Sequence, residues 1–413
     1  MRIRLRDAEQ ALRAAFRTTV FLLKVMPMFP SRAIDWLTPE PVVERVRYPT
    51  PDGGAEGDLY RPSRQGTYPS MVVCLGVVPF EEDHPQVPRL GAALARAGFA
   101  ALLYWSPAMR DVRLDPGDAE RIALAYRWLI EQPGVDPERS GLLGTCVGGS
   151  FALLAAADPR IRERVGFVIA WAPFASMCGL ATDIASATTR RGNGREPWVV
   201  DQLTRRVFVR SLTAGLSAEE AILLRDLCAE RRPQAAPGGL SSDARRIFPL
   251  LTELDDETTA STVEQLPAGL QAQFGRMSPL GRLGEVCAPV IVLAHDVGDQ
   301  VIPVGESRRI AAALAGRPGV RYTEFQMFQH LDPTKVRLPA VQLARELGKF
   351  YRSVYPVFHL AVVARSVSRG PAASPGRAPG EGGCAPRWPR RPRARWLRRR
   401  RTLPGGGGPA GAR

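Results

Sequence analysis

The 413-residue chain is poor in the groups that usually mark metal, redox and membrane proteins. It contains only four histidines and six cysteines, and the cysteines form neither a CxxC pair nor any zinc-ligand spacing. A membrane-spanning helix would need about 20 uninterrupted apolar residues, and the sequence has no such run. We therefore expect no metal and no cofactor. Scattered single thiols favour a reducing, cytoplasmic compartment over a disulfide framework.

Acidic residues are almost absent from the C-terminal segment. Residues 365–413 contain 13 arginines and one acid, so this segment carries +12 of the net charge of +15, and residues 1–364 carry only +3. The segment is rich in proline and glycine and cannot bury enough apolar surface to fold alone, which predicts a disordered tail or a misassigned end of the reading frame. Dense arginine also attracts nucleic acid or anionic lipid, but the nearly neutral remainder requires no nucleic-acid partner.

Residues 1–34 predict an amphipathic N-terminal helix. The apolar run from Thr18 to Phe29 is interrupted by Lys24 and Pro27, and no small-residue cleavage site follows, so neither a signal peptide nor a membrane span is indicated. We expect the helix to pack on the body of the protein. Weak peripheral membrane contact through residues 1–30 is the alternative, because arginines accompany the apolar positions. Those apolar positions are Leu5, Leu12, Phe16 and Leu23.

From residue 42 onward, strand-like and helix-like segments alternate. This pattern predicts an α/β fold with a mostly parallel sheet covered by helices on both faces. The expected strands span 42–48, 57–60, 70–77, 100–105, 139–145, 165–171, 289–295 and 321–328, and helices are expected at 90–97, 119–131 and 340–355. The first two strands are expected to pair antiparallel.

A long segment without strand-like alternation separates the last two predicted core strands from the earlier ones. The core is expected to comprise residues 35–172 and 287–364, and residues 173–286 show helix signals, such as a capping box from Ser217 to Glu220, without strand-like alternation. Because the interruption joins two strands at the edge of the sheet where ligands bind, we expect a helical lid over the site. An insertion that serves packing alone is the alternative.

The most informative segment runs from an apolar strand through a glycine-flanked cysteine into an alanine-rich helix. In the nucleophile elbow of G-x-S-x-G enzymes, glycines leave room for backbone that a Cβ atom would obstruct. Here Gly144, Gly148 and Gly149 supply that room and Cys146 occupies the nucleophile position. The first turn of the following helix offers unpaired N–H groups, which favour a thiolate. In a catalytically silent fold, the same cysteine would be a small buried hydrophobe.

A thiol nucleophile needs a base, and His330 is the histidine best placed to act as one. It follows the final predicted strand, on a loop expected at the carboxyl edge of the sheet. Its orienting acid should come just after the preceding strand, where Asp299 is favoured over Asp296 because it follows a glycine in the turn before the next helix. The other histidines are His84, His295 and His359, in an early loop, at a strand end and near the terminal helix.

The order Cys146, Asp299, His330 resembles that of the α/β-hydrolase superfamily. Within it, the G-x-C-x-G-G elbow and the acid turn Gly298-Asp-x-x-Ile-Pro303 resemble the dienelactone hydrolase family, and the similarity spans about residues 42–360. The resemblance implies that the cysteine attacks an ester or lactone, that the histidine relays the proton and that backbone N–H groups form an oxyanion hole.

Carried onto this chain, the resemblance places the first oxyanion donor at Val147 and the second at Val77 or its neighbours. One feature departs from the family, which often places a glutamate in the loop beside the resting thiol. This chain has Leu75, Gly76 and Val77 there, and its nearest acids are Glu81 and Glu82. The long interruption and the N-terminal helix are also absent from small members of the family, so the family's substrate is not carried over.

Cysteine itself restricts the chemistry. A thiolate leaves a tetrahedral intermediate more readily than a simple alkoxide does, so enol, phenol and thiol leaving groups compete best with it. The expected partner is therefore a small-molecule activated ester, lactone or thioester. Two other functions stay open: a silent hydrolase fold used for binding, and an acyltransferase with the same site. The sequence does not indicate an oligomeric state.

Overall fold

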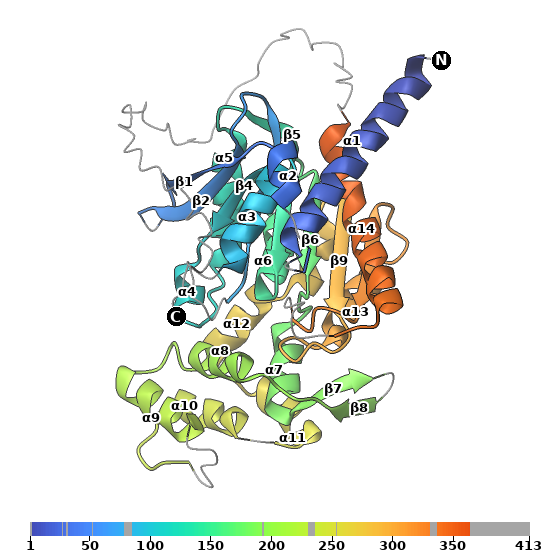
Figure 1. Cartoon of the computed structure of the whole chain (residues 1–413). Helices are drawn as coiled ribbons and strands as arrows, with labels where there is room; N and C mark the ends of the chain where they lie inside the picture. The colour runs from blue at the N-terminus through green and yellow to red at the C-terminus, as the bar shows by residue number, and fades with distance from the viewer. Residues whose placement is uncertain are drawn as a thin grey trace, which may run out of the picture.

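A twisted sheet of eight strands forms the centre of the computed structural model (Figure 1). The structure describes residues 2–26, 28–29, 32–51, 53–77, 85–191, 194–229, 236–252, 254–330 and 337–363. The strands of this sheet are β1 (Pro41–Tyr48), β2 (Ala55–Pro62), β3 (Tyr68–Cys74), β4 (Ala100–Tyr104), β5 (Val135–Thr145), β6 (Phe167–Trp171), β9 (Val290–Asp296) and β10 (Val320–Phe325). Their spatial order is β1-β2-β4-β3-β5-β6-β9-β10.

The sheet is mostly parallel. Strand β2 runs antiparallel to both β1 and β4, and the pairs from β4 through β10 are parallel. The predicted leading antiparallel pair is therefore confirmed, and so is the fold class: this is an α/β-hydrolase fold with helices on both faces. The sequence-based strand ranges all fall on observed strands, with boundaries that differ by a few residues.

Neighbouring residues of the central strands bury their side chains in opposite layers, which is why these strands are apolar at almost every position. One layer, which contains Val72, Leu102 and Leu142, packs against α5, α6 and α13. The other, which contains Val73 and Leu143, packs against α1, α3 and α14. The helices of these layers are α1 (Arg2–Val25), α3 (Gln86–Arg96), α5 (Asp118–Ile130), α6 (Val147–Ala156), α13 (Val304–Ala313) and α14 (Ala340–Val362), with the short α2 (Arg32–Leu37) and α4 (Pro107–Arg110) between them.

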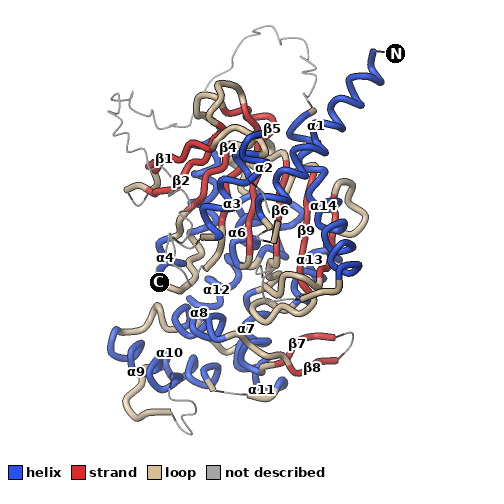
Figure 2. Tube along the Cα trace, in the orientation of Figure 1, coloured by secondary structure: helices blue, strands red, loops and turns tan. Residues whose placement is uncertain are grey.

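Residues between β6 and β9 form a separate group of elements beneath the carboxyl ends of the parallel strands (Figure 1). Most of this insertion is helical, as expected, and it also contains a two-stranded hairpin that the sequence analysis did not find (Figure 2). Its four-residue strands are too short and too polar to show apolar alternation. The elements are α7 (Met177–Ser186), β7 (Thr188–Arg191), β8 (Gly194–Pro197), α8 (Gln202–Leu212), α9 (Ala218–Ala229), α10 (Ser242–Ile247), η1 (Phe248–Leu251), α11 (Asp256–Glu264), α12 (Ala268–Met277) and η2 (Pro279–Glu285).

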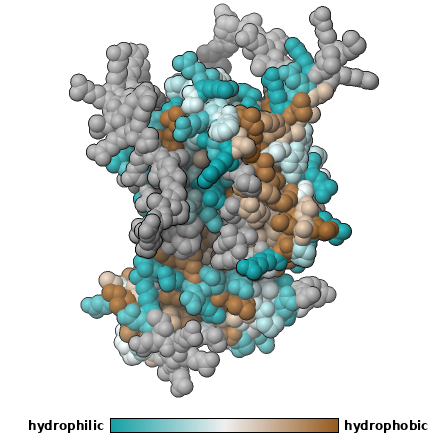
Figure 3. Space-filling model, viewed as in Figure 1, coloured by the Kyte–Doolittle hydropathy of each residue, from teal (hydrophilic) through white to brown (hydrophobic). Residues whose placement is uncertain are grey.

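Helix α1 packs on the body of the protein, against α3 and α14. Its buried face contains the small residues Ala14 and Thr18 together with Phe21, whereas Leu12 and Phe16 are 73% and 50% exposed. Two of the apolar positions identified in the sequence, Leu12 and Phe16, therefore lie off the packing face, whereas Leu23 is partly buried against the core. Figure 3 shows hydrophobic residues gathered on the face of the molecule that α1 crosses.

Among the described residues, no helix combines the length and the apolar character needed to cross a bilayer. Helix α14 continues past the predicted end at residue 355 to Val362, although Pro356 lies inside it. Several sequence-based predictions fall outside the described residues: the tail 365–413, His84, and the candidate acids Glu81 and Glu82.

Candidate active site

The turn between β5 and α6 holds Cys146 in a left-handed backbone conformation, with φ 57° and ψ −138°. Such a positive φ is unfavourable for a residue with a Cβ atom and is typical of strained turns at functional sites. The Cys146 N–H donates to the Trp171 carbonyl at 2.8 Å, which fixes the turn to the neighbouring strand β6. The side chain lies at the carboxyl end of β5 and the residue is only 6% exposed.

Two glycines make this turn sterically feasible. A Cβ atom on Gly144 would overlap the Gly148 carbonyl, and a Cβ atom on Gly148 would overlap the Cys74 carbonyl. Gly149 is less restricted, since its closest contact would be the Trp171 carbonyl oxygen at 3.2 Å. The predicted elbow is therefore present, and its close backbone approach explains the glycines on either side of the cysteine.

The structure brings Cys146, His330 and Asp299 together from three loops at the carboxyl edge of the sheet. His330 Nδ1 lies 2.8 Å from Asp299 Oδ2, and Cys146 lies close enough to the His330 ring to raise its pKa. Because a carboxylate can only accept, Nδ1 carries the proton in the bond to Asp299. This leaves Nε2 as the ring nitrogen available to the sulfur, the tautomer that a general base for a thiol requires.

Burial and the neighbouring charges act in opposite directions on the pKa of His330. Burial works to lower the pKa of His330, but the charge of Asp299, followed by that of Cys146 as a thiolate, raises it well above the ordinary value for histidine. Burial works to raise the pKa of Asp299, yet His330 holds it below its usual range. The pair therefore favours an imidazolium beside a carboxylate.

The acid turn is rigidly held. Asp299 Oδ1 accepts the N–H groups of Val301 at 2.7 Å and Ile302 at 3.0 Å, which leaves Oδ2 for His330. His295 lies behind the carboxylate, with Nε2 2.9 Å from the Ile302 carbonyl and 3.5 Å from Asp299 Oδ2. Burial lowers the pKa of His295, so this fully buried imidazole is neutral and serves to support the turn.

Asp296, the alternative acid, has a different environment. Its Oδ1 accepts the Gly298 N–H at 2.9 Å and its Oδ2 accepts the Phe328 N–H at 2.8 Å. Both oxygens are thus bound to backbone, and one of them anchors the loop that leads to His330. The Phe328 ring packs edge-on against Trp171 at 4.7 Å between ring centres, which holds the same loop from below.

The loop after β3 lies directly against the elbow. Thr145 Oγ1 donates to the Leu75 carbonyl at 2.8 Å, and a Cβ atom on Gly76 would lie 3.1 Å from Cys146 Cβ. Gly76 has φ 76°, a conformation that suits glycine. Val77 follows in this loop, and Val147 is the first residue of α6, where N–H groups have no acceptor within the helix.

Sequence reasoning did not find Trp198. This residue follows β8 in the insertion, and its indole Nε1–H donates to the Asp299 carbonyl at 3.2 Å. The two residues are far apart in sequence and belong to no common motif, so no sequence signal connects them. His359, in α14, stacks near Tyr355 with 5.8 Å between ring centres and is not part of the site.

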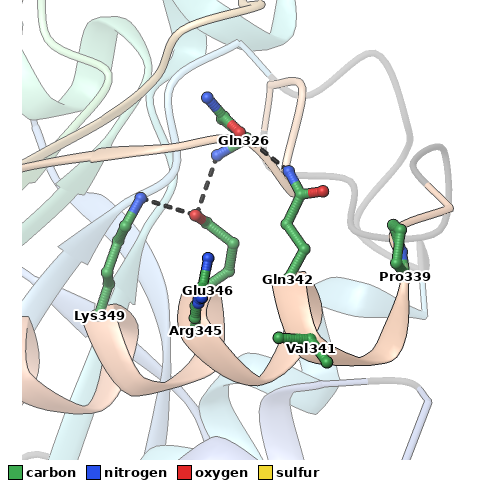
Figure 4. Close-up of a pocket in the computed structure, with 7 residues that line it drawn as sticks. All are labelled: Gln326, Pro339, Val341, Gln342, Arg345, Glu346 and Lys349. Carbon is green, nitrogen blue, oxygen red and sulfur yellow. Dashed lines mark hydrogen bonds and ion pairs between the residues drawn. The ribbon is translucent and has the colours of Figure 1, made fainter.

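A cavity of about 490 Å³ lies beside the start of α14 and contains none of the three candidate catalytic residues (Figure 4). Glu346 lines this cavity. It accepts hydrogen bonds from the Gln326 N–H at 3.0 Å and from the Lys349 ammonium group at 2.6 Å. These bonds, together with the one from Gln342 to Gln326 at 3.0 Å, join the start of α14 to the residue that follows β10. Among the described residues, no cluster of histidine, cysteine or carboxylate side chains could hold a metal ion.

No protein-family model matches the chain. A segment of 127 residues is 34% identical to a probable 2-oxo-3-(5-oxofuran-2-ylidene)propanoate lactonase of Bradyrhizobium, and the match covers 26% of this chain and 49% of that protein. The chain thus matches about half the length of this curated relative.

Solved structures similar to the chain have low sequence identity. 2,6-Dihydroxy-pseudo-oxynicotine hydrolase is 14% identical, with a TM-score of 0.47 over 75% of this chain and 68% of that one. Pyrococcus horikoshii acylaminoacyl peptidase is also 14% identical, with a TM-score of 0.48 over 79% of this chain and 44% of that one.

Proposed function

We propose that the protein is a hydrolase that cleaves activated carboxylic esters, lactones or thioesters through a covalent acyl-enzyme. The observation that carries this proposal is His330 placed between Asp299, to which it is hydrogen-bonded, and Cys146, to which it is electrostatically coupled, with the thiol on a positive-φ turn at the edge of the sheet. A fold used only for binding would need neither the strained turn nor a buried carboxylate aimed at this histidine.

In the first half-reaction, the thiol proton of Cys146 passes to His330 Nε2 and the sulfur bonds to the substrate's carbonyl carbon. The carbonyl π bond breaks, and its oxygen becomes an oxyanion. The N–H of Val147 and that of Val77 or a neighbour would stabilise this charge. When the intermediate collapses, the bond to the leaving group breaks and His330 gives that group its Nε2 proton. Asp299 keeps the imidazole in the correct tautomer throughout.

In the second half-reaction, water attacks the thioester. His330 Nε2 takes a proton from the water as its oxygen bonds to the carbonyl carbon, and the sulfur then leaves. The products are the carboxylate and the regenerated Cys146–His330 pair. If an alcohol or amine took the place of water, the same steps would make the protein an acyltransferase.

The leaving group limits the substrate class. A thiolate competes well against a simple alkoxide for expulsion, so a stabilised enolate, phenolate or thiolate is needed for the forward reaction. The partial relative is named for a 5-oxofuran-2-ylidene compound, whose ring is an enol lactone, and it supports this class. We further propose that residues 173–286 act as a cap on a core formed by residues 35–172 and 287–364.

A panel of aryl esters, enol lactones and acyl thioesters tests the function directly. We expect turnover on at least one class, an acyl adduct on Cys146 detected by mass spectrometry, and loss of both in Cys146→Ala. Cys178→Ala is the matched control, because Cys178 is exposed in the insertion and has no histidine partner. Absence of turnover and adduct on all three classes would favour the binding-only alternative; acyl transfer to added alcohol or amine in preference to water would identify an acyltransferase.

A further inference from the structure

Three hydrogen bonds connect the insertion to the turn that carries the acid. They reach the carbonyl oxygens of three consecutive residues of that turn, Asp299, Gln300 and Val301. The donors are Trp198 Nε1–H at 3.2 Å, the Asp201 N–H at 2.9 Å and the Thr204 hydroxyl at 3.1 Å, in that order. A contact repeated at every peptide of a turn fixes the orientation of all three peptide planes.

The donors are themselves held in place. The Trp198 N–H donates to the Ala187 carbonyl at 2.8 Å, and the residue is 8% exposed. Asp201 caps α8 by accepting the Leu203 N–H at 2.8 Å, and Thr204 lies in the first turn of the same helix. The insertion therefore offers a rigid edge to the acid turn.

We propose that Trp198 and Thr204 are positioning residues for the proposed reaction, which hold Asp299 against His330 through the backbone of the acid turn. This inference rests on the proposed function. Asp299 uses both carboxylate oxygens within the turn and on His330, so any rotation of the 299–301 peptides also moves Oδ2. It follows that the insertion is more than a cover: a shift of α8 on substrate entry would change the Asp299–His330 contact.

Two variants each remove one of these hydrogen bonds; Thr204→Val keeps the shape of the side chain, and Trp198→Phe keeps an aromatic ring at a buried position while making the side chain smaller. Trp198→Phe loses the indole N–H, and Thr204→Val loses the hydroxyl. We expect each to lower kcat by about three- to tenfold, as loss of one hydrogen bond allows, with little change in KM. The alkaline limb of kcat/KM, and the midpoint of the NMR titration of the His330 ring protons, should move to lower pH, because a looser carboxylate raises the pKa of His330 less.

Ser211→Ala is the matched control. Ser211 lies at the other end of α8, and its hydroxyl accepts the Leu114 N–H at 3.0 Å, so this bond also joins the insertion to the core but does not reach the acid turn. We expect Ser211→Ala to reduce the free energy of unfolding while leaving both pH profiles unchanged.

The two pH profiles decide the matter. If Trp198→Phe and Thr204→Val lose stability as Ser211→Ala does and keep the wild-type profiles, the bonds are structural only and the inference is wrong. The NMR titration of His330 needs no substrate, so it tests the inference even if Trp198→Phe or the whole panel of substrates gives no turnover. Turnover that survives in Cys146→Ala would instead overturn the proposed function.

Discussion

At the residue scale, one buried carboxylate sets the proton affinity of the proposed base. Asp299 raises the pKa of His330, and His330 lowers the pKa of Asp299, so each charge stabilises the other in the folded protein. The two pKa shifts predict opposite dependences of stability on pH. The contribution of His330 to stability is present at low pH and lost as the pH rises through its raised pKa, and that of Asp299 is lost as the pH falls through its lowered pKa.

Replacing this carboxylate gives a pH-dependent prediction. In Asp299→Asn the pKa of His330 should fall, so the alkaline limb of kcat/KM should move to lower pH, and turnover should drop by about 10²- to 10⁴-fold. His330→Ala should cause a loss of similar size. The measurement is kcat/KM against pH for an activated ester.

Asp296→Asn is the control for this prediction. Its oxygens accept backbone N–H groups of Gly298 and Phe328 and do not touch His330, so we expect a much smaller change in turnover. If Asp296→Asn were the crippling change and Asp299→Asn silent, the acid would be assigned to the wrong residue. If neither these aspartates nor His330 mattered to a measurable activity, the mechanism would fail.

The reactivity of the thiols gives a second prediction. Cys146 should react fastest with an alkylating reagent, because it has a helix N-terminus and a histidine partner. Burial raises the pKa of Cys74 to about 12 and that of Cys228 to about 11, which makes both poor nucleophiles at neutral pH. Mass spectrometry of partly labelled protein identifies the first site. Preferential labelling of the exposed Cys178 or Cys287 would count against the catalytic role of Cys146.

The residues of the candidate site differ in how far the sequence could predict them. Cys146 lies in a local motif, and Asp299 and His330 each follow a strand that the hydrophobic pattern identifies, so all three were predictable. Trp198 was not, since its bond to the Asp299 carbonyl depends on how the insertion folds back on the core. A contact between distant segments leaves no mark in local composition.

At the element scale, α1 has two faces with different consequences. The face of Ala14, Thr18 and Phe21 is buried against the body, and the opposite face leaves Leu12 and Phe16 in solvent. Hydropathy identified the helix, but two of its large apolar residues lie off the packing face, because periodicity weighs large apolar residues above small ones such as Ala14. The short hairpin of β7 and β8 was missed for a related reason, since four-residue polar strands show no period.

The exposed stripe on α1 makes membrane contact testable. If basic and apolar side chains of this helix bind the surface of an anionic bilayer, then Leu12→Glu combined with Phe16→Glu should abolish co-sedimentation with phosphatidylserine vesicles. Val341→Glu is the control, because Val341 is 67% exposed on α14, away from α1. Equal co-sedimentation of the wild type and the double variant, or none by the wild type, would show that α1 serves packing alone.

At the scale of the whole molecule, the insertion and the core act as one unit, because the acid turn bonds to both. The alternation of strands and helices predicted the core, and the position of the interruption predicted that the insertion would lie at the carboxyl edge of the sheet. How the two parts meet could not be predicted. The bonds that join them, such as Leu114 N–H to Ser211 and Thr204 to the Val301 carbonyl, depend on the relative placement of whole elements.

The net positive charge is distributed unevenly along the chain. Residues 365–413 carry +12 of the +15 and contain none of the residues proposed for catalysis. Deleting them should therefore leave turnover and the free energy of unfolding unchanged and should sharply reduce retention on heparin, because attraction of a polyanion depends on clustered positive charge. Elution from heparin in a salt gradient, beside kcat/KM and a denaturant titration, measures all three. A truncated protein that lost turnover would place a functional group in the tail, and one that kept its heparin retention would move the polyanion-binding surface to the arginines of the body.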